Sequence, residues 1–89
     1  MKYRLQQYIV ISSVGDEYMV LNESDGSCQV LNETAGWLAS MATEPVSIDR
    51  AVELAIQRYT VQPGTNLEEE ILQSLQELQK LGILSVIQE

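Results

Sequence analysis

The chain contains no histidine, no phenylalanine and a single cysteine among its 89 residues. Without histidine, neither a Ser–His nor a Cys–His nucleophilic pair can be built, and the commonest base near neutral pH is missing. One cysteine excludes a disulfide within the chain and, in the absence of histidine, a zinc site made of Cys and His. Carboxylate pairs remain, but no pattern in the sequence places two of them in a cleft. The sequence therefore predicts a protein that is not an enzyme and that needs no metal or other cofactor.

Positive charge is also scarce, since 5 Lys and Arg stand against 13 Asp and Glu, which gives a net charge of −8. Nucleic acids and anionic membranes bind cationic surfaces, so this balance argues against both as partners. The first residues, 1–4, lead into a mixed segment rather than the apolar run of a signal peptide. No apolar run approaches the roughly 20 residues that span a bilayer. We expect a cytoplasmic protein.

The length allows one small domain, which we expect to cover residues 1–89, with no internal repeat or linker. Three short apolar runs, at 8–11, 18–21 and 27–31, are separated by turn clusters at 14–17 and 22–26. The second cluster contains Asp25-Gly26, a strong hairpin signal. These runs predict a three-stranded antiparallel sheet, which needs cover on one face to be stable.

Side chains of the third run alternate between the two faces of this sheet. Cys28 and Val30 fall on one face, and Ser27, Gln29 and Leu31 fall on the other. A free cysteine is usually a small buried apolar residue, and we expect this of Cys28.

Helical periodicity fills the rest of the chain. Asn32 is a good N-cap for a helix through about Ala42, and Ser47 caps a second helix that follows the break at 44–46. After a loop at 61–64, a capping box at 65–68 predicts the start of a third helix. Gly82 is placed to end that helix, with Ile83 packing back onto Leu78. The tail, 84–89, is either a short strand or a packed end.

The predicted fold class is α+β, with a three-stranded antiparallel sheet followed by a three-helix bundle, as in a winged helix-turn-helix. That fold often binds DNA, but fold alone does not decide function. A recognition helix needs Lys or Arg, and the second helix offers only Arg50 and Arg58 and the third only Lys80. A DNA-binding regulator is therefore the weaker alternative.

A more specific indication lies in the order of short motifs. The strand-turn-strand segment ends in Leu31-Asn32-Glu33-Thr34, which is followed by the small pair Ala35-Gly36 and an apolar helix. The last helix ends in a hydrophobic-glycine pattern, which reads Leu78-Gln79-Lys80-Leu81-Gly82-Ile83-Leu84. In this order, over about residues 8–87, the chain resembles the PqqD family, the leader-recognition domains of ribosomally made, post-translationally modified peptides.

The resemblance implies an adaptor in natural-product biosynthesis that binds the leader of a precursor peptide. Such an adaptor presents the peptide to a modifying enzyme, such as a radical-SAM protein or the leader protease and cyclase of lasso-type systems. The leader pairs with a free strand edge, while its apolar side chains enter a groove. On this chain the edge is residues Ser27, Cys28, Gln29, Val30 and Leu31, and the groove wall is Glu68, Ile71, Leu72 and Leu75. An exposed edge can also pair with a second copy, so a dimer fits this expectation.

Simpler structural roles compete with these assignments. The apolar stripe of the third helix is also what a core-facing helix requires, and Glu68 to Glu70 suit the positive end of a helix dipole. Trp37, with Met41 four residues on, forms either an exposed patch for a partner or a half-buried contact under the sheet. A third function stays open, namely an acidic subunit that regulates an enzyme without binding peptide.

Overall fold

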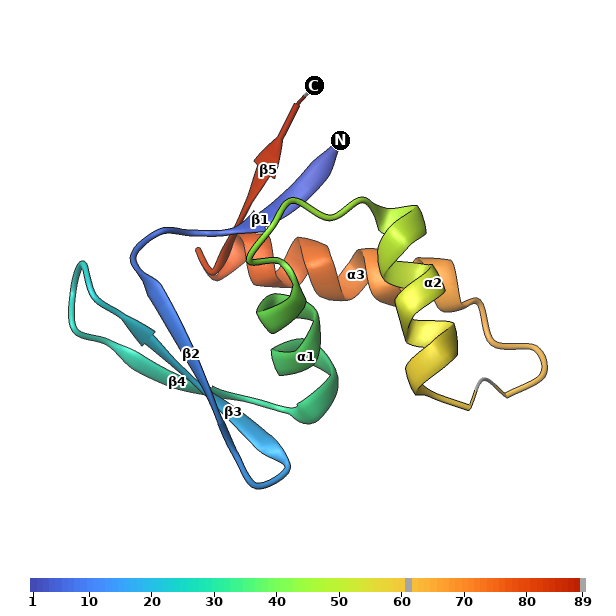
Figure 1. Ribbon diagram of the computed structural model, residues 1–89, viewed down its shortest axis with the longest axis horizontal. Helices are drawn as coiled ribbons and strands as arrows, with labels where there is room; N and C mark the ends of the chain where they lie inside the picture. The colour runs from blue at the N-terminus through green and yellow to red at the C-terminus, as the bar shows by residue number, and fades with distance from the viewer. Residues whose placement is uncertain (61, 89) are drawn as a thin grey trace.

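The computed structural model describes residues 1–60 and 62–88, so Val61 of the predicted loop and Glu89 of the predicted tail lie outside the described residues. Along the chain the elements are the strands β1 (Lys2–Leu5), β2 (Ile9–Val14), β3 (Glu17–Asn22) and β4 (Cys28–Leu31), the helices α1 (Glu33–Met41), α2 (Ile48–Arg58) and α3 (Leu67–Lys80), and the strand β5 (Leu84–Ile87) (Figure 1). The predicted α+β class, a three-stranded antiparallel sheet followed by three helices, is confirmed.

The three-stranded sheet is an antiparallel meander with the order β2-β3-β4. β2 extends past the predicted run to Val14, which pairs with Glu17 across a tight turn. That turn is possible because Gly15 adopts a left-handed φ of 62°. Because β3 lies in the middle of this order, β2 and β4 are the two edges of the sheet.

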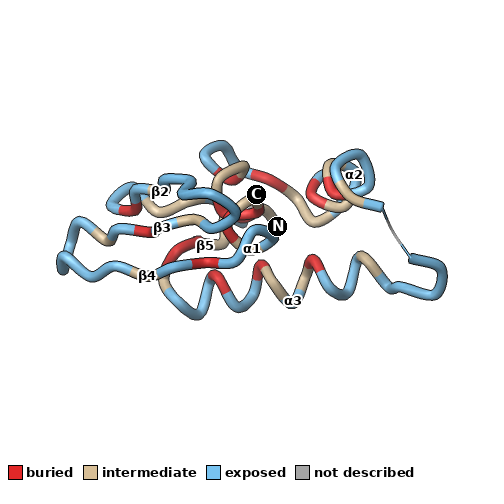
Figure 2. Tube along the Cα trace, turned by 90° about the horizontal axis from the view of Figure 1, so that it is seen from below, coloured by how far each residue is buried: buried red, intermediate tan, exposed pale blue. Residues whose placement is uncertain are grey.

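One face of the meander is covered by α1. Ile9, Val20 and Leu31, one from each strand, are buried on this face. Gly36 lets α1 approach β3 closely, because the position of a Cβ on this residue is already filled by the ring of Tyr18. α3 packs against both α1 and α2, and Figure 2 shows its buried residues on the side turned toward the rest of the molecule.

The helix N-caps follow the sequence, with one correction. Asn32 accepts a hydrogen bond from the amide of Ala35, and Ser47 accepts one from Arg50, as expected. The capping box predicted at 65–68 is wrong by one residue, because α3 is capped by Asn66, whose Oδ1 accepts from the Glu69 amide at 3.1 Å. The amide of Thr65 instead donates to the carbonyl of Gln62, closing a turn that ends just before the helix.

The end of α3 is the predicted left-handed glycine cap. Gly82 has φ 79°, its amide donates to the Gln79 carbonyl, and the amide of Ile83 donates to the Leu78 carbonyl at 3.0 Å. These two bonds form a Schellman motif, which turns the chain directly into β5.

The predicted tail is a strand, and it pairs with an element that the sequence did not indicate. β5 runs antiparallel to β1, with Tyr3 opposite Val86. Tyr3 also bridges to Val46 in the α1–α2 connection, and its side chain is buried. This two-stranded sheet brings the described ends of the chain side by side (Figure 1). Among the helices of the described residues, none has the length and apolar character that crossing a bilayer requires.

Candidate peptide-binding site

The free edge of β4 is the first component of the candidate site. Within the part of the chain that is described, β4 pairs with β3 and with no other strand. At its start, the Asn22 amide donates to the Ser27 carbonyl at 2.9 Å, and hydrogen-bonded pairs alternate along an antiparallel ladder. The next such pairs therefore join Gln29 to Val20 and Leu31 to Tyr18. The backbone N–H and C=O groups of Cys28 and Val30 are left directed away from β3, toward the open edge.

Side chains along β4 alternate as the sequence predicted. Leu31 is 7% exposed and faces α1, whereas Val30 is 58% exposed. Cys28 shares the outer face with Val30 and is exposed, so the expectation of a buried cysteine is wrong. The reason is that both residues lie on the face opposite to the buried Leu31, where burial by α1 does not reach.

A groove of about 260 Å³ lies between the end of β4 and the C-terminal half of α3. Apolar side chains from both elements line it, including Leu31, Leu78 and Leu81. Leu81 is 47% exposed although it is a large apolar residue, because it stands at the rim of this groove. The remaining lining is Val30, Asn32, Thr34, Ala35, Ser74 and Glu77.

The four residues predicted as the groove wall lie elsewhere on α3. Ile71 and Leu75 are buried in the core, Leu72 is half-buried and Glu68 is exposed in the first turn. None of the four is among the residues that line the groove beside β4. That groove instead uses the 74, 77, 78 and 81 positions, whose spacing marks one helix face. This face mixes Ser74 and Glu77 with Leu78 and Leu81, so the sequence gave no sign that it borders a groove.

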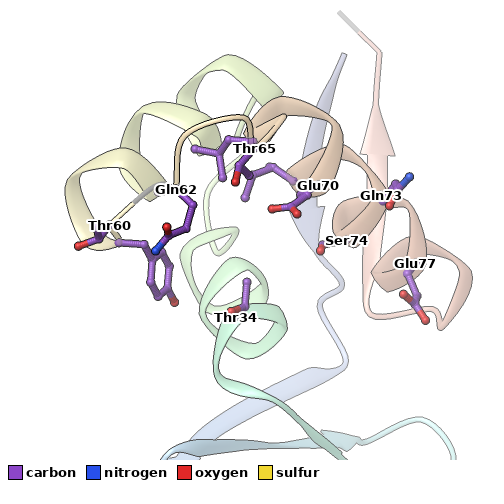
Figure 3. Close-up of a pocket in the computed structure, with 12 residues that line it drawn as sticks. Thr34, Thr60, Gln62, Thr65, Glu70, Gln73, Ser74 and Glu77 are labelled. Atoms are coloured by element: carbon purple, nitrogen blue, oxygen red, sulfur yellow. The ribbon is translucent and has the colours of Figure 1, made fainter.

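A larger cavity of about 490 Å³ adjoins the groove. It lies among the start of α1, the end of α2 and the N-terminal half of α3 (Figure 3). Ile71 and Leu67 form part of its lining. Thr34, Ser74 and Glu77 line both the groove and the cavity, so the two lie next to each other. Of the predicted site residues, Val30 and Leu31 line the groove and Ile71 lines the adjoining cavity, while Leu75 is buried in the core.

The comparisons with known proteins bear on this surface. The family model described as Coenzyme PQQ synthesis protein D (PqqD) matches residues 17–84. The chain belongs to the PqqD family. The match begins at β3 and ends at β5, so it contains β4, the groove and all three helices. The resemblance noted in the sequence is therefore confirmed.

Two solved structures share the PqqD-family fold of this chain. One, described as "TbiB1 in Complex with the TbiA(beta) Leader Peptide", has a TM-score of 0.77 and 17% identity, and the match covers 97% of this chain and 99% of that one. The other, "Lasso peptide synthetase B1 complexed with the leader peptide", has a TM-score of 0.75 and 20% identity, with 97% and 100% covered. No curated protein sequence matches the chain.

Trp37, Tyr59 and Arg58 form a cluster in this PqqD-family chain, and Tyr59 is part of the lining of the larger cavity. Trp37 is half-buried and meets Tyr59 edge to face, with ring centroids 5.5 Å apart. The Arg58 guanidinium lies 5.3 Å from the Trp37 ring and forms an ion pair with Glu33 at 3.3 Å. A hydrogen bond to the Tyr59 hydroxyl, with a further one to Glu33, raises the pKa of Arg58. Trp37 is half-buried, as one of the two expectations had it, but the ring contacts found among the described residues join it to Tyr59 and Arg58 at the end of α2 rather than to the sheet.

Proposed function

We propose that this PqqD-family protein binds the leader of a ribosomally made precursor peptide along β4. The observation that carries the proposal is an open strand edge directly beside a groove with apolar walls. Family membership supports it, as do two proteins of the same fold whose structures are described as complexes with a leader peptide. Strand addition is a common way to hold an extended peptide against such an edge.

In this geometry the backbone of β4 contributes affinity, and the side chains of the groove contribute selectivity. Main-chain hydrogen bonds to Cys28 and Val30 give affinity that depends little on the leader sequence, each contributing about 0.5–1.5 kcal/mol net. Leader residues that pair with Gln29 and Leu31 place their side chains on the same face of the sheet as these two residues, which is the face toward the groove. Residues opposite Cys28 and Val30 point outward. Every second side chain of the leader therefore contacts the groove, which selects among leader sequences.

The role we propose is that of an adaptor, a single domain over residues 1–89 that catalyses nothing itself. It holds the leader while a separate enzyme, such as a radical-SAM protein or a lasso-type leader protease, acts on the rest of the precursor. We infer that binding needs no metal, and within residues 1–60 and 62–88 no group of His, Cys, Asp and Glu is placed to hold one. Incubating the pure protein with a precursor should therefore leave the precursor mass unchanged.

The main test removes one outward backbone donor. Val30→Pro deletes an N–H that points to the open edge but leaves the bonds between β4 and β3 intact. We expect leader affinity to fall about two- to tenfold, as the loss of one such hydrogen bond implies, measured by titrating a labelled synthetic leader and following fluorescence anisotropy. The synthetic leader has the sequence of a precursor peptide whose gene neighbours the gene for this protein.

Ser13→Pro is the matched control. The Glu23 amide donates to the Tyr8 carbonyl, so by the same alternation the N–H of Ser13 points to the outer edge of β2. This variant loses an equivalent donor at the wrong edge and should bind the leader as the unmodified protein does. Circular dichroism and urea unfolding establish that both variants are folded. Equal leader affinity in Val30→Pro and the unmodified protein would show that β4 is not the binding edge.

A further inference from the structure

Two carboxylates, Glu70 and Glu77, line the larger cavity from α3. They are seven residues apart, which places them on the same face of the helix and about 10.5 Å apart along its axis. Both are exposed, and both project from α3 in Figure 3. Across the described part of the chain, the ion pairs found are Arg50–Glu53 and Arg58–Glu33, and neither includes these two carboxylates.

The local structure does not account for Glu77. Glu70 lies in the first turn of α3, where the helix dipole favours negative charge. Glu77 lies near the other end of the helix, where that dipole is unfavourable to a carboxylate. Lys80 follows one turn later, yet the two form no ion pair in the described structure. Glu77 is thus an unpaired negative charge at the junction of groove and cavity.

The lining of the larger cavity combines apolar and polar side chains, and its charged members among the described residues are Glu70 and Glu77. Ala55, Tyr59, Leu67 and Ile71 contribute apolar surface, and no Lys or Arg is among the described residues that line the cavity or the groove. The protein as a whole carries a charge of −8. A peptide segment that fits this surface combines an apolar side chain with a positive charge.

We propose that the leader read by this protein carries Lys or Arg next to a large apolar residue, just outside the segment that pairs with β4. This inference rests on the proposed function and specifies its substrate. The apolar side chain enters the larger cavity, and the cation lies between Glu77 and Glu70. Because the cavity adjoins the C-terminal end of β4 through Thr34, the leader passes Glu77 as it leaves the strand.

The test uses a set of labelled synthetic peptides with one β-forming segment in common. The residue beyond that segment is Leu, and its neighbour is Lys, Gln or Glu, placed at either end of the segment. We expect the Lys peptide to bind the unmodified protein about tenfold more tightly than the Glu peptide at low salt, with Gln between them. Raising the salt from about 0.05 M to 0.5 M should shrink that ratio, since these charges are exposed.

The double variant Glu70→Gln/Glu77→Gln should lower the affinity for the Lys peptide about threefold and raise that for the Glu peptide by a similar factor, which brings the three peptides close to equal. Glu44→Gln/Asp49→Asn removes the same charge at exposed positions that line neither cavity, and it should keep the preference for Lys. This control separates a local effect from that of net charge.

The outcomes separate this inference from the proposed function. If the peptides bind, Val30→Pro weakens them and Lys is not preferred, then strand addition holds and the cationic leader is refuted. If the control pair abolishes the Lys preference as well, the effect belongs to net charge and the assignment to Glu70 and Glu77 is wrong. If none of the peptides binds the unmodified protein, both proposals fail.

Discussion

Gly36 shows how one residue sets the distance between α1 and the sheet. Replacing glycine by alanine inside a helix ordinarily stabilises a protein by about 0.5–1 kcal/mol. Here the added Cβ would overlap the ring and Cβ of Tyr18, atoms close to the β3 backbone that cannot swing away. We therefore expect Gly36→Ala to lower the free energy of unfolding by about 1–3 kcal/mol, measured by urea denaturation.

Repeating Gly36→Ala in a variant of Tyr18 tests whether the contact with Tyr18 causes the loss of stability. In Tyr18→Gly both the ring and the Cβ are gone, so adding Gly36→Ala should cost little or should even stabilise, as it does in an open helix. The same loss in both backgrounds would mean that the close approach of Tyr18 is not its cause.

At the scale of residues, much of the sheet could be predicted from the sequence. The alternation that separates Val30 from Leu31 follows from the strand period alone and is confirmed. The exposure of Cys28 could not be predicted, because the period says which residues share a face but not which face a helix covers. Leu81 shows a related limit. It continues the apolar stripe of α3, but it is exposed and lines a groove instead of being buried in the core.

At the scale of elements, Gly82 joins α3 to β5. Its φ of 79° strains any residue with a side chain, least of all asparagine. We expect Gly82→Ala to cost about 1–2 kcal/mol of unfolding free energy and Gly82→Asn clearly less, both measured by urea denaturation. A Cβ at this position meets open space, so the loss comes from backbone strain alone. Equal costs for the two variants would contradict this origin.

Local signals predicted the helices well and the second sheet poorly. Caps such as Asn32, Ser47 and Gly82 act on hydrogen bonds within a few residues, so the sequence states them directly. β1 has no such signal, because it is a strand only through its pairing with β5 at the other end of the chain. The groove beside β4 could not be placed from the sequence for the same reason: its position on α3 depends on where β4 meets the helix.

At the scale of the whole molecule, charge and size predict how salt acts on stability. A net charge of −8 within a radius of gyration of 12.8 Å repels itself, and the repulsion is relieved on unfolding. The screening length is about 30 Å at 0.01 M salt and about 10 Å at 0.1 M, so added salt removes repulsion across the molecule. Salt also weakens the two exposed ion pairs of Arg50 and Arg58, but such pairs contribute only about 0–1 kcal/mol each.

We therefore expect the free energy of unfolding to rise, by an amount on the order of 1 kcal/mol, between about 0.01 M and 0.2 M NaCl. Urea denaturation at each concentration measures the rise, and chloride is used because sulfate would stabilise the fold by exclusion from its surface. Glu44→Gln/Asp49→Asn, with less charge to screen, should show a smaller rise. A midpoint that falls with salt would mean that the ion pairs outweigh the repulsion, and that the excess of carboxylates is arranged on the surface so that it costs the fold little.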